Sequence, residues 1–177
     1  MLVTVSGPPG SGTTTTAEHL AARLGIELVP GGEVFRAMAA ERGMSLPEFG
    51  RYAAEHPEVD VELDSRLADR ARRGDVIIES RLAAWIARNE GLRAVTVYVT
   101  CSPEERARRV ARREGTSPER ALADNAERER VERERYLALY GIDVDDLSVF
   151  DLVLDSGELS PDELAERIAD AACARFG

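Results

Sequence analysis

Eight residues near the N-terminus have the types and spacing of a loop that wraps around a phosphate group: Gly7-Pro8-Pro9-Gly10-Ser11-Gly12-Thr13-Thr14. They match the pattern G-x-x-x-x-G-[K]-[ST] at every fixed position except the lysine, which is Thr13. The glycines let successive N–H groups point at phosphate oxygens, and a helix that opens at Thr14 adds its positive dipole end. We predict that a phosphate-bearing cofactor is bound by Gly7, Pro8, Pro9, Gly10, Ser11, Gly12, Thr13, Thr14 and Thr15. The alternative is a tight strand-to-helix turn whose glycines serve packing only.

Two oxygen-bearing side chains are candidates for holding Mg²⁺ beside this loop. Thr14 stands where the hydroxyl of such a loop ligates the metal. Glu79 ends the apolar run Asp75-Val-Ile-Ile-Glu79 and resembles the acid of a Walker B element, near the metal or its waters. Taken by itself, that acid is equally consistent with a surface residue after a strand. With Thr13, the loop lacks the lysine that usually bridges two phosphates, and our hypothesis is that an arginine supplies this charge.

Arginines are the candidate partners of a transferring phosphoryl group, because fixed cations and positioning provide most of the catalysis in that reaction. Two triplets have helical spacing, which predicts a shared helix face for each: Arg106, Arg109 and Arg113, then Arg128, Glu132 and Arg135. The predicted catalytic residues are Arg36, Arg81, Arg109, Arg113, Arg128 and Arg135. For any single arginine the alternative is a solvated face of Glu–Arg pairs.

The charge balance limits the partners of this chain. Its 177 residues carry a formal net charge of −10, and all 23 basic residues are arginine. Such a chain should repel nucleic acid and anionic membranes. We interpret the excess of acidic residues as a halophilic adaptation. In a high-salt cytoplasm, salt screens the repulsion between these negative charges. GC-rich coding bias is the alternative explanation for arginine over lysine.

Other features of the composition indicate one soluble domain. Hydrophobic residues make up 44% and charged residues 32%, and the length suits a single core. No apolar run approaches the roughly 20 residues of a membrane helix. We expect a cytoplasmic protein with no obligatory protein partner. The two cysteines, Cys101 and Cys173, have no metal or redox spacing and are expected to be buried or half-buried thiols.

Short apolar strands alternate with helices along the chain. The pattern predicts strands at 2–6, 26–29, 76–78, 94–99 and 152–154. Helices are expected after the phosphate loop, after a Gly31-Gly32 turn, at 58–73, and after capping serines at 45, 102, 117 and 160. This alternation predicts an α/β fold with a five-stranded parallel sheet and helices on both faces. The helical stretches 32–73 and 102–140 are expected as insertions over the carboxyl ends of the strands.

The chain resembles the archaeal-type cytidylate kinases, which phosphorylate CMP and dCMP and belong to the nucleoside monophosphate kinase superfamily of P-loop kinases. The resemblance covers nearly the whole length and is most specific in its middle. Beyond residues 7–14, it is carried by Gly32–Arg36, Ala39–Leu46, Tyr52–Asp60, Glu79–Trp85, Arg112–Gly115, Arg128–Tyr136, Tyr140–Asp143 and Asp151–Val153.

The resemblance implies transfer of the γ-phosphoryl group of ATP, with Mg²⁺, to CMP or dCMP. It implies that Arg36 and Arg81 hold the acceptor phosphate and that Arg128 and Arg135 reach the acceptor phosphate or base. Arg109 and Arg113 would be lid arginines, and the loop of Asp155-Ser156 would pass the donor base. No general base is expected, because the acceptor is already an oxyanion at neutral pH.

The same resemblance implies one domain over 1–177, with a monophosphate-binding insertion at about 32–73 and a short lid with flanking helices at about 102–140. Two rival functions remain open at this point. One is another small-acceptor P-loop kinase, such as an adenylate kinase. The other is a nucleotide-binding module that lacks transferase activity because Thr13 disables the phosphate loop.

Overall fold

A five-stranded parallel sheet forms the centre of the molecule in the computed structural model, which describes residues 1–177. The strands lie in the order β2-β3-β1-β4-β5, and their bounds are Leu2–Ser6 for β1, Glu27–Pro30 for β2, Val76–Glu79 for β3, Val95–Thr100 for β4 and Leu152–Asp155 for β5. The predicted parallel sheet is therefore confirmed. Because β1 lies between β3 and β4, the chain that follows β1 emerges at the centre of the carboxyl edge, where ligands bind in such sheets.

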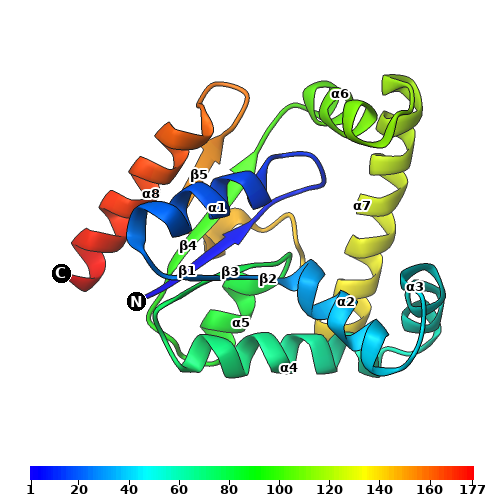
Figure 1. Cartoon of the computed structure of the whole chain (residues 1–177), viewed down its shortest axis with the longest axis horizontal. Helices are drawn as coiled ribbons and strands as arrows, with labels where there is room; N and C mark the ends of the chain where they lie inside the picture. The colour runs from blue at the N-terminus through cyan, green and yellow to red at the C-terminus, as the bar shows by residue number, and fades with distance from the viewer.

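Helices cover both faces of the sheet (Figure 1). On one face, Val3 and Val5 pack with residues of α1 (Thr13–Leu24) and α8 (Pro161–Phe176). On the other, Leu2 packs with residues of α4 (Glu58–Arg72) and α5 (Ala83–Asn89). All five residues of β1 are buried, which is why this strand reads as a continuous apolar run rather than an alternating one.

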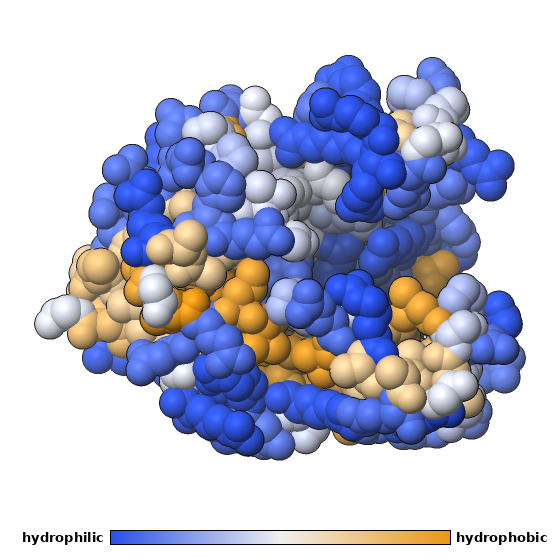
Figure 2. All heavy atoms as spheres, viewed as in Figure 1, coloured by the Kyte–Doolittle hydropathy of each residue, from blue (hydrophilic) through white to orange (hydrophobic).

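The remaining helices stand beyond the carboxyl ends of the strands. Figure 1 shows α2 (Gly31–Glu41) and α3 (Leu46–Glu55) on one side of that edge, and α6 (Pro103–Glu114) and α7 (Pro118–Tyr140) on the other. In the same orientation the molecular surface is hollowed between α1, α2 and α7, and hydrophilic side chains of α6 and α7 form its upper rim (Figure 2). The two helical stretches that interrupt the β/α alternation thus flank one cleft.

Three local expectations differ from the structure. Helix α5 was not predicted from the sequence, because it has only seven residues and its N-cap, Leu82, provides no side-chain cap. Gly31 and Gly32 were expected in a turn but form the first residues of α2, directly after the extended Pro30. A Cβ on Gly31 would lie 3.2 Å from Ser80, so close packing against the β3 end favours glycine there. Cys101 is buried as expected, but Cys173 was expected to be buried or half-buried and is exposed.

The serine caps are confirmed at Ser45, Ser102, Ser117 and Ser160. The hydroxyl of each accepts a hydrogen bond from the backbone N–H three residues later. Such caps satisfy the unpaired N–H groups of a helix start and fix where each helix begins. None of the helices is both long enough and apolar enough to span a lipid bilayer.

A hydrogen bond ties α4 to the end of α7. The Tyr140 hydroxyl donates to Asp64 Oδ2 at 2.6 Å. Burial raises the pKa of the Asp64 carboxyl to about 6, although the Tyr140 hydrogen bond opposes the shift. A carboxyl whose pKa is higher in the folded chain than in the unfolded chain stabilises the fold fully below its unfolded pKa. That contribution is lost as the pH rises through the folded value.

Replacing Asp64 with Asn should therefore stabilise the protein at pH 8 by up to about 3 kcal/mol, since a shift of about two pKa units corresponds to roughly 1.4 kcal/mol per unit. The gain should vanish below about pH 4, where wild-type Asp64 is also neutral. Urea unfolding of both proteins at pH 4 and pH 8 measures the difference. The exposed Asp170→Asn is the control and should change the free energy of unfolding by less than about 0.5 kcal/mol at either pH. A pH-independent effect of Asp64→Asn would contradict the assignment.

Candidate active site

The loop between β1 and α1 is packed so closely that Gly7 and Gly10 have no room for a side chain. A Cβ on Gly7 would lie 2.3 Å from the Val99 carbonyl oxygen, and one on Gly10 would lie 2.7 Å from the Arg106 carbonyl oxygen. Gly10 and Gly12 also have φ of +81° and +88°, a left-handed region that residues with a Cβ rarely adopt. The loop's curved path therefore depends on these residues being glycine.

Helix α1 begins directly behind this loop and differs from the serine-capped helices. Its N-cap is Gly12, and no side chain accepts a hydrogen bond from its first turn, which also carries no acidic residue. The first N–H groups of α1 and the positive end of its dipole are thus available to an anion at the carboxyl end of β1. We call this loop and the start of α1 the cradle, and its geometry suits a phosphate group.

Thr13 bridges the cradle to β3. Its hydroxyl donates to Glu79 Oε1 at 2.8 Å, and Glu79 lies beside Val5 in the register of β3 with β1. Thr14 and Thr15 are exposed at the start of α1. The residue at the lysine position therefore orients the Walker B-like acid, a contact that the sequence did not predict.

The residues around this point suit Mg²⁺ but form no complete cage. No group of three or more His, Cys, Asp and Glu side chains gathers there or elsewhere in the structure. Thr14 and Glu79 carry oxygen donors, which Mg²⁺ prefers, and Mg²⁺ bound to a nucleotide commonly takes only one or two protein ligands and completes its shell with phosphates and water. The donor set fits such a metal.

Arg106 contacts the cradle through a backbone carbonyl and was not among the predicted catalytic residues. Its buried guanidinium donates to the carbonyl oxygens of Cys101 at 3.2 Å and Pro9 at 3.3 Å, and it forms an ion pair with Glu129 of α7. The helical spacing that put Arg106 in one triplet with Arg109 and Arg113 was the only signal in the sequence. The exposed fractions of the three side chains, 8%, 28% and 65%, show that they do not act as one face.

Arg109 lies against the cradle through the β5–α8 loop. It donates to Ser156 Oγ at 2.9 Å and to the Ser156 carbonyl at 2.8 Å, and Ser156 Oγ donates to the Ser11 carbonyl at 2.6 Å. Its Nη1 is 3.7 Å from the position of a Cβ on Gly12. Arg113 instead donates to Glu114 at the end of α6 and makes no contact with the cradle.

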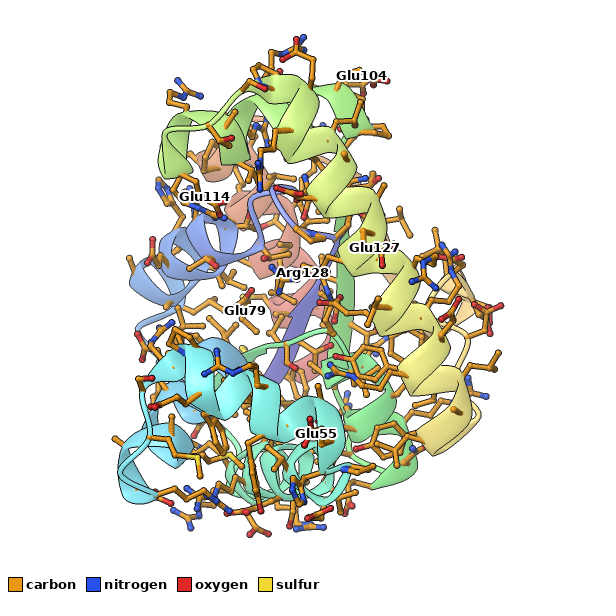
Figure 3. The ribbon with its side chains drawn as sticks, turned by 90° about the vertical axis from the view of Figure 1, so that its right-hand side faces the viewer. Glu55, Glu79, Glu104, Glu114, Glu127 and Arg128 are labelled. Carbon is orange, nitrogen blue, oxygen red and sulfur yellow. The ribbon has the colours of Figure 1, made fainter.

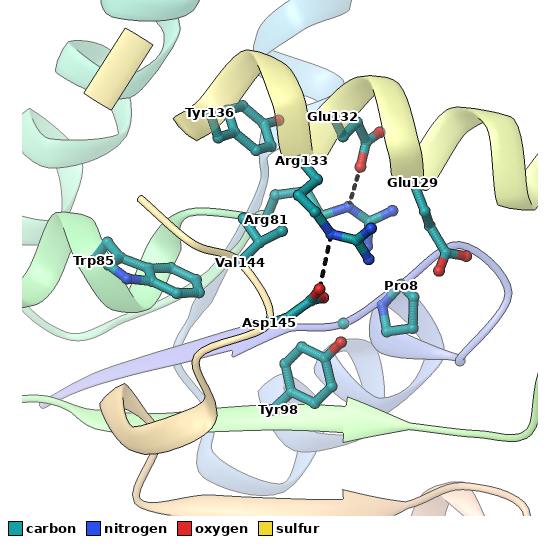
Figure 4. A pocket seen from close by; sticks show the side chains of 11 residues that line it. Pro8, Arg81, Trp85, Tyr98, Glu129, Glu132, Arg133, Tyr136, Val144 and Asp145 are labelled. Atoms are coloured by element: carbon teal, nitrogen blue, oxygen red, sulfur yellow. Dashed lines mark hydrogen bonds and ion pairs between the residues drawn. The ribbon is translucent and has the colours of Figure 1, made fainter. Parts of the chain in front are cut away.

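Arg81, Glu132 and Arg128 come together on the other side of the cradle, although Arg81 follows β3 and the other two lie on α7. Arg81 Nε donates to Glu132 Oε2 at 2.7 Å, and Arg128 Nε donates to Glu132 Oε1 at 2.8 Å. Figure 3 shows Arg128 projecting from α7 toward the cleft that holds Glu79. Arg81 and Glu132 also line a cavity of about 50 Å³ together with Gly7 and Pro8 (Figure 4).

The last two predicted arginines, Arg135 and Arg36, do not line that cavity. Arg135 packs over the Tyr136 ring, with its guanidinium carbon 5.1 Å from the ring centroid, and its Nε is 3.5 Å from Asp60 Oδ2. Asp60 is buried, which raises its pKa against the opposing effect of Arg135, and sequence reasoning gave it no role. The Arg36 side chain on α2 is 58% exposed, and its ion pair with Glu33 is long, at 3.9 Å.

Solved structures share this fold at low sequence identity. A protein from Eubacterium ventriosum superposes with a TM-score of 0.76 at 18% identity, and the alignment covers 99% of both chains. A shikimate kinase from Acinetobacter baumannii superposes with a TM-score of 0.60 at 19% identity, covering 99% of this chain and 94% of the other. These likenesses, with the cradle between β1 and α1, define the P-loop fold class.

The sequence comparisons narrow that class. The family model described as the cytidylate kinase-like family matches residues 2–158. A cytidylate kinase of Pyrobaculum aerophilum is 47% identical over 173 residues, which cover 98% of this chain and 93% of that protein. A cytidylate kinase of Pyrococcus abyssi is 48% identical over 162 residues, covering 92% and 88%. The chain belongs to the cytidylate kinase-like family, and membership in a kinase family implies ATP as the phosphoryl donor.

Replacing Gly10 with Ala should weaken ATP binding at least tenfold while leaving the protein folded, because the new methyl group forces the cradle away from the Arg106 carbonyl. Isothermal titration with ATP measures the change. Gly50→Ala is the matched control, since Gly50 lies inside α3 with no atom within 4 Å of its Cβ position, and its ATP affinity should stay within twofold of wild type. Equal ATP affinity in Gly10→Ala and wild type would show that the cradle does not bind the nucleotide.

Proposed function

We propose that this protein is a cytidylate kinase that transfers the γ-phosphoryl group of ATP to CMP, giving ADP and CDP, with dCMP as a second acceptor. The observation that carries the proposal is the second cationic cluster beside the cradle. Arg81 and Arg128 meet at one carboxylate, and Arg81 shares a cavity with Gly7 and Pro8. An acceptor that is itself a phosphate requires such a second cluster, whereas a module that binds ATP alone does not.

In this proposal the donor phosphates lie on the cradle and the first turn of α1. The acceptor phosphate is held by Arg81 and Arg128, with Arg36 reaching it from α2 and Arg135 lying beside it or the base. Fixed guanidinium groups stabilise the charge of the transferring group and align donor and acceptor, so no side chain has to remove a proton. Bound Mg²⁺ would neutralise charge on the donor phosphates, with Thr14 and Glu79 as its protein partners.

The charge missing at Thr13 has two candidate sources. Arg109 lies closest to the end of the cradle, beside Gly12, but both of its Nη groups already contact Ser156. Arg36 makes no hydrogen bond and is exposed, so its guanidinium is free to approach bound nucleotides. Arg113 would contribute only if α6 moved when the site closes. Lid closure would also exclude water and so prevent hydrolysis of ATP.

In this proposal the helices on the two sides of the cleft have different functions. We assign acceptor binding to about 32–73, which spans α2, α3 and α4, and lid movement to about 102–140, which spans α6 and α7. Both belong to one domain over 1–177. We also propose that the enzyme works in a salt-rich cytoplasm, since its net charge of −10 calls for screening, and that it needs neither a membrane nor a nucleic acid partner.

A panel of acceptors tests the function. ADP formation from ATP and Mg²⁺ is measured with CMP, dCMP, UMP and AMP, at low and molar salt. CMP and dCMP should give the highest kcat/KM, and molar salt should not abolish it. A strong preference for AMP over CMP would identify an adenylate kinase instead. Tight ATP binding without turnover of any acceptor would identify a disabled nucleotide-binding module.

Arg81→Ala separates acceptor binding from donor binding. Loss of a charged contact to the acceptor phosphate should lower kcat/KM for CMP about 100-fold or more while the Kd for ATP stays within twofold. Steady-state kinetics and ATP titration measure the two quantities. Arg88→Ala is the control, because Arg88 is an exposed residue of nearby α5 and should leave both unchanged. Unchanged CMP turnover in Arg81→Ala would contradict the proposed acceptor site.

A further inference from the structure

Glu132 occupies an unusual position, as a carboxylate between the two arginines assigned to an anionic ligand. It lies at the middle of α7, and only 14% of its side chain is exposed. Each of its oxygens accepts a hydrogen bond from a different guanidinium, Oε2 from Arg81 and Oε1 from Arg128. An acid beside a phosphate site would ordinarily oppose anion binding, so its contacts need an explanation.

The contacts are explained by which guanidinium nitrogens bind the Glu132 carboxylate. Arg81 and Arg128 both bind Glu132 through Nε, and neither guanidinium makes any other hydrogen bond. Their Nη groups are therefore free, and Figure 4 shows the Arg81 guanidinium between Glu132 and Pro8 of the cradle. When Nε of an arginine is already hydrogen-bonded, its guanidinium group is held in one orientation before a phosphate binds. Less side-chain entropy is then lost on binding.

The charge of Glu132 is also maintained by these neighbours. Burial alone would raise the pKa of its carboxyl, but Arg81 and Arg128 outweigh burial and hold the pKa below its ordinary value. The carboxylate thus remains an acceptor for both arginines at neutral pH. The cluster of two guanidinium groups and one carboxylate retains one net positive charge for an incoming anion.

We infer that Glu132 is a positioning residue for the acceptor phosphate, which fixes Arg81 and Arg128 at a set separation so that their free Nη groups bind one phosphoryl group. The inference rests on the proposed function. It differs from two other roles for this acid: direct contact with the sugar of the acceptor, and a purely structural tie between α7 and the residues after β3.

Glu132→Gln tests the role with little change in shape. The glutamine amide keeps one acceptor oxygen, but its NH₂ group faces a guanidinium donor, so one arginine loses its anchor. We expect kcat/KM for CMP to fall about 10- to 100-fold, with the KM for ATP within twofold of wild type. The loss should be the same for CMP and dCMP, because both carry the phosphate that the arginines bind.

A double-mutant cycle with Arg128→Ala tests whether Glu132 acts through the arginines. If it does, adding Glu132→Gln to Arg128→Ala should cost less than Glu132→Gln costs in the wild type, because one of its two targets is already absent. Additive losses would overturn the inference. A loss with CMP that is absent with dCMP would place Glu132 on the sugar and would overturn it too.

Glu134→Gln is the matched control on the same helix. Glu134 makes an exposed i, i+4 pair with Arg130, and its loss should leave the kinetics unchanged. Thermal unfolding checks that each variant is folded. If Glu132→Gln is unfolded, Glu132→Asp keeps the charge but is one methylene too short to reach both Nε atoms, and it should lose at least fivefold in kcat/KM for CMP; wild-type kinetics in Glu132→Asp would overturn the inference.

Failure of this inference and failure of the proposed function give different results. All ratios are taken with whichever monophosphate the wild-type protein uses best. If that acceptor is not CMP, the proposed substrate is wrong while Glu132 is still tested through the acceptor's phosphate. If CMP is the best acceptor and Glu132→Gln matches wild type, only the positioning role is wrong.

Discussion

A site for two phosphate-bearing ligands needs a local excess of positive charge, and this protein must provide it in an acidic chain that has no lysine. Arginine is suited to the task, because its fork can bind a carboxylate on one edge and leave the other edge for a phosphate. Arg81 and Arg128 are held in this way by Glu132. The acids around the cleft therefore do not simply cancel its cations; they determine how those cations are presented.

The cradle depends on a different kind of positive charge, that of the backbone. Gly7 and Gly10 allow the loop to pass within contact distance of β4 and α6, and Gly12 lets α1 begin with its first N–H groups uncapped. Buried Arg106 then links the Pro9 carbonyl to α7 through Glu129. As a result, the helix that carries Glu132 and Arg128 is joined to the glycine loop through one buried side chain.

Much of the fold could be predicted from local sequence. The five strands are short, largely apolar runs, of which β1 and β3 are the most deeply buried, and the serine caps mark where four helices begin. Helix α5 escaped prediction because its seven residues carry no cap and its stability comes from packing against β1 and α4. Gly31 and Gly32 were wrongly predicted as a turn because glycine pairs usually mark turns, whereas here they begin α2 and close packing against Ser80 favours glycine at position 31.

The sequence alone determined the order of elements, the phosphate loop and the pool of arginines, because each depends on residues that are neighbours along the chain. Only the tertiary structure decided which arginines serve which purpose. Arg81 meets Glu132 across 51 positions, Thr13 meets Glu79 across 66, and Arg109 meets Ser156 across 47. Helical spacing put Arg106, Arg109 and Arg113 in one set, yet packing buried the first, set the second against the cradle and left the third in solvent. The reason is physical: a guanidinium's role is set by the groups that the fold brings to it, and spacing along one helix does not specify them.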